Sequence, residues 1–453
     1  MGDITHEPDS DGAARHAGVI AEEYDIARQY GRMSGPAERR RAFAVLFVSL
    51  VCMGAGQSVI YTILPPAART LDMDAFKVFC IFAVSALIWV FSSTYWGARS
   101  DRWGRKPVML LGLVAFSISF LAFATTMLGG LRHWLPIAFV FPLLIVSRCI
   151  YGTFGSGTSA AAQAYVADRT TPKERLSGVA IISMAFALGT TFGPIIGSAL
   201  TFVGLLAPFY FISALALASA AAVYFLLPER TPPKLHRPQA TTLRWHQRRM
   251  FPFIAFGLVL SLIASIPVQT VSFFAMDVLK QSPHVSARFA GIGLTVSALA
   301  ALFAQFVIVQ RSGLSSRIQT SIGLIVAALS NALFLVTDAG HHLLVLVALA
   351  LSGIGFGMAR PGFTSGASLS VAPHEQGAVA GLLNAAGAAG FIFGPLIGWF
   401  YDLSPYVPYV FGTAMMLALL AAQYLSPVLR HAGDIPPDIA AAEEAVETPP
   451  PGT

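Results

Sequence analysis

The chain has 453 residues, of which 55% are hydrophobic and only 11% carry a formal charge. With a mean hydropathy of +0.67, this composition excludes an ordinary soluble domain and indicates a membrane protein with many spans. The net charge of +6 does not indicate a nucleic-acid partner, because the arginines and lysines gather in short turns beside apolar segments.

Residues 1–41 are polar and of mixed charge, and we expect a cytoplasmic tail, because the first apolar run begins too late for a signal peptide. The cysteines lie within apolar segments, which argues against a disulfide framework. Metal-ligand spacings are missing from the sequence, so we expect neither a metal nor another cofactor. The cysteines are Cys52, Cys80 and Cys149.

Twelve apolar segments follow, and each is long enough to cross a bilayer as a helix, which takes about 20 residues. They are residues 42–66, 76–96, 107–128, 136–165, 176–203, 208–227, 250–276, 287–310, 318–338, 342–368, 377–401 and 406–428. Lysine and arginine between the segments fall mostly on the side of the two tails. Both termini are therefore predicted to be cytoplasmic, in the inner (plasma) membrane.

A proline-rich basic stretch divides these segments into two sets of six. We expect an N-terminal six-helix bundle, a cytoplasmic linker, a C-terminal six-helix bundle and a cytoplasmic tail. Their predicted ranges are 42–227, 228–249, 250–429 and 430–453. The run from Gly189 to Gly197 recurs from Gly390 to Gly398. This repeat predicts two parallel halves with a site between them, one of the ways in which transporters are built.

A dense polar stretch from Gly97 to Pro107 separates the second and third segments, where we expect a tight turn. Its pattern, G-x-x-x-D-R-x-G-R-K, resembles the signature loop of the major facilitator superfamily. The resemblance implies an all-α membrane protein, with 12 transmembrane helices in two pseudo-symmetric six-helix bundles. A purely topogenic basic loop is the alternative, but it would need neither the glycines nor an aspartate.

The resemblance also implies a gate on the cytoplasmic side. In this gate Asp101 caps the eleventh segment near Gly377, where a carboxylate is favoured by the helix dipole, and Arg105 pairs with Asp168. The gate is expected to be stable only in the outward-open state. The predicted gating residues are Gly97, Asp101, Arg102, Gly104, Arg105 and Asp168.

The glycine-proline run in the fifth segment resembles a motif of exporters that exchange drugs for protons. Glycines four residues apart form a smooth stripe for close helix packing, and a proline permits a bend. The predicted hinge or packing residues are Gly189, Gly193, Pro194 and Gly197, with Gly394 and Pro395 in the repeat. A static packing groove is the alternative.

The fourth segment carries Arg148 followed by Gly152, Gly155 and Gly157, which resembles the R-x-x-x-G-x-x-x-G pattern of drug/proton antiporters. An arginine near the bilayer centre costs roughly 2.5–3.5 kcal/mol on insertion scales, so it should face a cavity or a partner. The alternative is a structural arginine held by carbonyls and water. Arg360 is a second intramembrane charge, for which a site role and snorkelling remain equal alternatives. The predicted substrate-binding or coupling residues are Gln57, Tyr61, Arg148, Tyr151, Gln269, Phe273, Arg360 and Asn384.

We therefore predict a monomeric secondary transporter that exports a drug-like or amphipathic molecule by alternating access, in exchange for protons. The segment interiors contain no aspartate or glutamate, so the proton carrier is either a rim carboxylate such as Asp101 or Asp277, or absent. The main alternative is a facilitator or symporter of an organic anion or other polar metabolite, with Arg148 and Arg360 as counter-charges. A third alternative is a sensor or scaffold protein that does not transport a substrate.

An enzyme is not expected, because the sequence pairs no nucleophile with a base. A phosphate-binding glycine-rich loop with a lysine is also missing, which excludes drive by ATP.

Overall fold

The computed structural model describes residues 36–170, 172–228, 251–370, 379, 383, 386–387 and 389–430. These residues are mostly helical and contain no strand. The helices are α2 (Pro36–Arg69), α3 (Ala75–Trp103), α4 (Arg105–Leu131), α5 (Ile137–Ile150), η1 (Tyr151–Gly155), α6 (Ser156–Ala167), α7 (Pro172–Leu200), α8 (Ala207–Leu226), α9 (Phe251–Asp277), α10 (Pro283–Phe303), η2 (Ala304–Val309), α11 (Gln310–Ser312), α12 (Ser316–Leu335), α13 (His342–Leu369), η4 (Gly390–Phe393), α15 (Gly394–Leu403), α16 (Val407–Leu425) and α17 (Pro427–Arg430).

The predicted fold class, with twelve transmembrane helices, is confirmed. Ten helical stretches of the described chain are long and apolar enough to cross a membrane, where α5–η1–α6 and α10–η2–α11 each count as one. The fifth span is α7, whose apolar part is Met184–Leu200. η4 and α15 belong to the eleventh predicted span.

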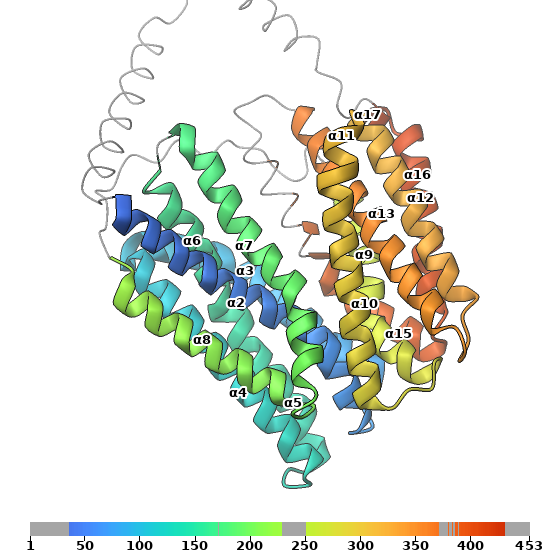
Figure 1. Cartoon of the computed structure of the whole chain (residues 1–453), viewed down its shortest axis with the longest axis horizontal. Coiled ribbons are helices and arrows are strands. Elements are labelled where there is room, and N and C mark those ends of the chain that lie inside the picture. Colours follow the sequence, from blue (N-terminus) through green and yellow to red (C-terminus); the bar gives the residue numbers. More distant parts are fainter. Residues whose placement is uncertain are drawn as a thin grey trace, which may run out of the picture.

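The helices form two bundles, which Figure 1 shows in blue to green (α2–α8) and in yellow to red (α9–α16). In the first bundle α2 packs along α7 and α8, and α4 packs along α8. In the second, α12 packs on α13 and α16. Helices of each half therefore pack along one another, and the buried hydrophobic side chains of the two halves form one continuous cluster.

The two halves pack against each other at one end. The helix pairs that join them are α3 with α15, α7 with α10, and α2 with α9 and α10. Among the described residues, the hydrogen bonds, ion pairs and ring contacts between the halves involve α2 from Tyr61 on, the first turns of α3, and the residues directly after α7 that contact Arg288 of α10. We call this end the closed end, and the opposite end, which carries Gly104 and Asp168, the basic end. In Figure 1 the ribbons of the two halves diverge from the closed end towards the basic end at the top.

Several helices extend beyond the predicted boundaries, and two of them, α2 and α3, do so the furthest. The first begins at Pro36 instead of residue 42, since proline is tolerated in the first turn of a helix. The second continues to Trp103, so the stretch from Gly97 to Trp103 is helical and the predicted turn is wrong there. Alanine and arginine are good helix formers, so the polar residues mark where the apolar part ends and not where the helix ends. The only break is Gly104, whose φ of 96° favours glycine.

Candidate functional site

Arg148 is the centre of a polar cluster inside the N-terminal half. Its side chain is only 1% exposed, and its Nη2 donates to Gln57 Oε1 at 3.2 Å and to Ser85 Oγ at 3.3 Å. The guanidinium also lies over the ring of Tyr151, 4.3 Å from its centroid. Among the described residues, Nε and Nη1 of Arg148 have no hydrogen-bond partner. The cluster thus holds a buried positive charge with unused donors.

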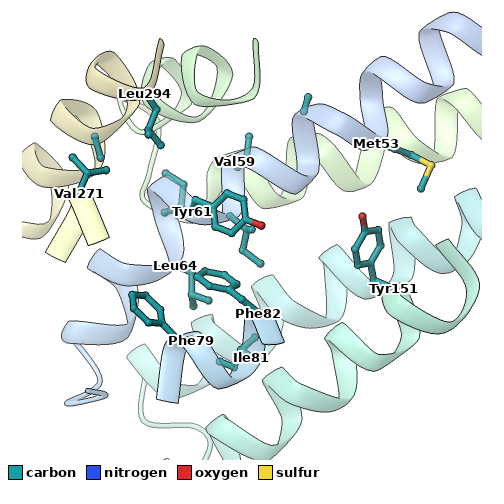
Figure 2. Close-up of a cluster of buried hydrophobic side chains, with 14 of the residues drawn as sticks. Met53, Val59, Tyr61, Leu64, Phe79, Ile81, Phe82, Tyr151, Val271 and Leu294 are labelled. Atoms are coloured by element: carbon teal, nitrogen blue, oxygen red, sulfur yellow. The ribbon is translucent and has the colours of Figure 1, made fainter. Parts of the chain in front are cut away.

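The cluster continues along α2 to the interface between the halves. Gln57 Nε2 donates to the hydroxyl of Tyr61 at 3.0 Å, and in Figure 2 this hydroxyl points to the side on which Tyr151 lies. The ring of Tyr61 stacks on Phe391 of η4, with centroids 5.9 Å apart. Tyr61 therefore contacts both the arginine cluster and the other half.

Glycine packing fixes the position of the helix that carries Arg148. A Cβ on Gly152 would lie 2.9 Å from the carbonyl oxygen of Ser85, so only glycine allows α3 this close. A π-helical turn, η1, begins at Tyr151, directly after the arginine's own turn. Such turns inside α-helices often mark functional sites. Ser85 was not predicted, because a serine in an apolar helix gives no signal in the sequence.

Three of the predicted residues of the C-terminal half make no hydrogen bond or ring contact with this cluster in the described chain. Gln269 is fully buried, and its Oε1 is next to Gly394; its amide atoms have no hydrogen-bond partner among the described residues. Phe273 packs against Phe79 in the closed end, with ring centroids 6.0 Å apart. Arg360 is exposed on α13.

Asn384 lies outside the described residues. Asn331 on α12 was not predicted; it is 1% exposed, and neither atom of its amide group has a hydrogen-bond partner in the described chain. Unpaired buried amides are costly in a membrane protein, so Asn331 and Gln269 are further candidates for contact with a ligand.

Arg105 holds three helix ends together at the basic end. Its Nε bonds Asp168 Oδ2 at 2.9 Å, so the predicted pair is present. The pair was expected in a gate that closes this end, and it forms here although the ribbons of the two halves diverge towards this end. The other nitrogens of Arg105 contact Asp101 Oδ1 at 2.6 Å and Ser100 Oγ at 2.6 Å. These bonds lie within the N-terminal half, so they do not themselves join the halves. The role of Gly97, Asp101, Arg102 and Gly104 in gating stays a prediction, and the expected cap near Gly377 lies outside the described residues.

The glycine stripe of α7 packs along α2 within one half. A Cβ on Gly193 would collide with Ser58 Oγ and the carbonyl of Ala55, and one on Gly189 would collide with the carbonyl of Val51. A Cβ on Gly197 would lie 2.9 Å from Thr62 Oγ1. The backbones touch, as small-residue stripes permit.

The repeated glycines make other contacts. A Cβ on Gly394 would lie 3.5 Å from the carbonyl oxygen of Phe79 in the opposite half. Pro395 stands in the first turn of α15, where proline costs no helical hydrogen bond. Pro194 lies inside the continuous helix α7, and its carbonyl approaches Gly291 of α10 in the other half.

The sequence matches the model of the Major Facilitator Superfamily over residues 46–395 and again over residues 258–449. The chain belongs to this family. It is thus similar to transporters over almost all of its transmembrane part, in agreement with its helical spans.

Named relatives of the chain include drug resistance proteins. The chain is 28% identical to multidrug resistance protein 2 of Bacillus subtilis, over 84% of this chain and 94% of that protein. It is 25% identical to the class B tetracycline resistance protein of Escherichia coli, over 78% of this chain and 86% of that protein. The human organic anion transporter MFSD10 has a similar fold, with a TM-score of 0.58 and 20% identity, over 85% of this chain and 99% of that one.

As a member of the superfamily, the protein is a multi-pass membrane transporter of small molecules. Arg148, Gln57, Tyr61 and Tyr151 are the predicted site residues that the fold brings together. Within the described chain, no hydrogen bond, ion pair or ring contact joins Arg360 or Gln269 to this group, so a shared site would need both halves to line one cavity.

Proposed function

We propose that the protein exports a drug-like or amphipathic small molecule from the cytoplasm, in exchange for protons. The observation that carries this proposal is the similarity to multidrug and tetracycline resistance proteins over about four fifths of the chain. The proposed substrate site is at Arg148, which is buried and has two nitrogens without a hydrogen-bond partner in the described chain.

The basic end is the cytoplasmic end in this proposal, because cytoplasmic loops carry an excess of arginine and lysine. The structure then corresponds to a protein closed towards the outside, with the two halves apart at the cytoplasmic end. Alternating access requires a second state, in which the halves meet at the basic end and part at the closed end.

In this proposal the proton is carried by a carboxylate near an end of the helices. The described residues include no aspartate or glutamate with a buried side chain, and a neutral carboxyl group is the usual carrier between aqueous sides. Asp101 and Asp277 are the carboxylates proposed for this task.

Export is tested in cells that express the chain and are loaded with a fluorescent lipophilic cation. Cells with the protein should retain less of the dye than cells with the Arg148→Ala variant at equal protein level. Collapse of the proton gradient by an uncoupler should remove the difference. Equal retention in all three cases would contradict the proposal.

An organic anion is the second candidate substrate. The guanidinium of Arg148 contacts neutral groups and aromatic rings, and none of its described partners is a carboxylate. A carboxylate or phosphate of a substrate would supply the missing acceptors for Nε and Nη1. A relative in fold, MFSD10, is described as an organic anion transporter. Uptake of labelled organic anions into the same cells separates the two candidates.

A further inference from the structure

The closed end is held by acidic side chains that reach from the C-terminal half to the N-terminal half. Asp277 is the last residue of α9, and its Oδ2 pairs with Arg69 Nη2 of α2 at 2.8 Å. The Tyr401 hydroxyl donates to the same oxygen at 3.1 Å. The guanidinium of Arg69 also lies over the ring of Phe273, 4.9 Å from its centroid. This ion pair connects the ends of α2 and α9.

A second carboxylate, that of Asp402, caps α3 from the other half. Its two oxygens accept from the backbone nitrogens of Ala75 at 3.1 Å and of Phe76 at 2.9 Å. Asp74 accepts from the next nitrogen, that of Lys77, at 2.9 Å. The first N–H groups of a helix have no partner within the helix and carry partial positive charge. Asp402, from the other half, therefore accepts hydrogen bonds from two of these N–H groups. Its negative charge also lies at the positive end of the helix dipole.

Glycine packing brings Asp402 to this position. One turn earlier on α15, a Cβ on Gly398 would lie 2.8 Å from the Cα of Phe76 and 3.1 Å from the carbonyl oxygen of Ala75. Only a residue without a Cβ lets the backbone of α15 approach the first turn of α3 so closely. The cap thus depends on the second copy of the repeated glycine motif.

We propose that Asp277 and Asp402 form a latch that holds the closed end shut, and that both contacts must break each time this end opens. This inference rests on the alternating access proposed above. The cap of Asp402 on α3 has a counterpart in the predicted cap of Asp101 on the eleventh span. Helix α3 and the eleventh span then cap each other with a carboxylate, Asp402 at the closed end and Asp101 at the basic end. Each cap stabilises one of the two states.

Arg288 of α10 also bridges the halves, because its Nε donates to Thr201 Oγ1 at 3.2 Å and its guanidinium lies over the ring of Phe202, 3.8 Å from the centroid. The lysines at the closed end make only local contacts in the described chain. Lys77 pairs with Asp74 in the same helix turn, and the Lys280 ammonium donates to the backbone carbonyl of Asp277. Asp72 is exposed in the connection between α2 and α3. Its replacement by asparagine is a matched control, because it removes an acidic charge beside the latch without touching either contact.

The latch is tested by the distance between spin labels on the two halves. Labels at Arg132→Cys and Gly340→Cys, both exposed at the closed end, are measured in full-length protein whose three native cysteines are replaced. Asp402→Asn keeps the size of the side chain but loses its charge. We expect it to raise the population with the longer distance about twofold to fivefold, the effect of one charge at a helix end. Asp72→Asn should leave the distribution unchanged.

A charge exchange tests the other contact. Asp277→Arg and Arg69→Asp should each raise the open population, and the double variant should restore the wild-type distribution. An unchanged distance distribution in Asp402→Asn and in both single charge variants, when the wild-type protein transports, would overturn the latch. A shift in these variants without transport by any form would support the latch and count against the proposed export.

Discussion

At the scale of single residues, Arg148 is the side chain that we propose binds the substrate. A hydrogen bond to a charged group contributes about 1.5–3 kcal/mol, and lysine cannot reach Gln57 and Ser85 in the geometry of the guanidinium. We therefore expect Arg148→Lys to lower the transport rate about tenfold or more at an equal amount of protein in the membrane. Arg311→Lys, at an exposed site of the basic end, is the control. Unchanged transport kinetics in Arg148→Lys would show that the arginine has only a structural role.

Asp101 is predicted to act in the cycle and not in the stability of the state described here. Its pair with Arg105 is partly exposed, with 42% of the aspartate side chain accessible, and such pairs contribute little to stability. Asp101→Asn should remain in the membrane in normal amount and lose most of its transport, measured as initial rates of efflux. Asp338→Asn, in an exposed connection, should behave as wild type. Normal efflux by Asp101→Asn would remove it from the gate.

The sequence predicted the cluster's members on α2 and α5 but not their surroundings. Arg148, Gln57 and Tyr61 stand out because polar side chains are rare in an apolar span. Ser85 and Asn331 do not, since small hydroxyls and amides occur in spans without a functional role. Phe273 was expected in the cavity and packs in the closed end, because an aromatic residue in a uniformly apolar helix gives no hint of its face.

At the scale of helices, the stripe of α7 on α2 is a packing contact. Overpacking of a close interface costs about 1–3 kcal/mol, and Gly193 has the backbone of Ala55 against it. Gly193→Leu should therefore lower the thermal unfolding temperature in detergent and the amount of protein in the membrane. Gly204→Ala, which meets no atom within 4 Å in the described chain, is the control. Equal unfolding temperatures would show that α7 moves freely on α2, as a hinge requires.

Gly97 on α3, unlike Gly193, does not lie in a close helix contact in the described chain. A Cβ there would meet no described atom within 4 Å, and alanine in a helix is favoured over glycine by about 0.5–1 kcal/mol. Gly97→Ala should leave the unfolding temperature equal or higher and yet slow transport, because the glycine is needed when the basic ends meet. A variant with wild-type transport would contradict this role.

The helices themselves were predictable, because runs of about 20 apolar residues leave little choice in a bilayer. Their ends were not: α3 continues to Trp103, since polarity marks the membrane boundary and only Gly104 breaks the helix. The cap of Asp402 on α3 joins residues far apart in the sequence. No local pattern could predict it before the packing of the two halves was known.

At the scale of the whole molecule, two helical bundles meet at one end and carry a buried positive charge in one of them. A secondary transporter of this kind needs two states of similar free energy, so that a ligand can shift their populations. The latch at the closed end and the predicted gate at the basic end give each state its own inter-half contacts. The central claim is that passage between these states exports a substrate and returns protons.

The most direct test uses everted membrane vesicles with an acid interior and a pH-sensitive dye. Lipophilic cations and then organic anions are added singly, with vesicles that contain Arg148→Ala or no transporter as controls. The account predicts that a lipophilic cation dissipates the gradient in wild-type vesicles alone. A response to anions only would favour the second candidate substrate, and a gradient that no compound dissipates would contradict proton-coupled export.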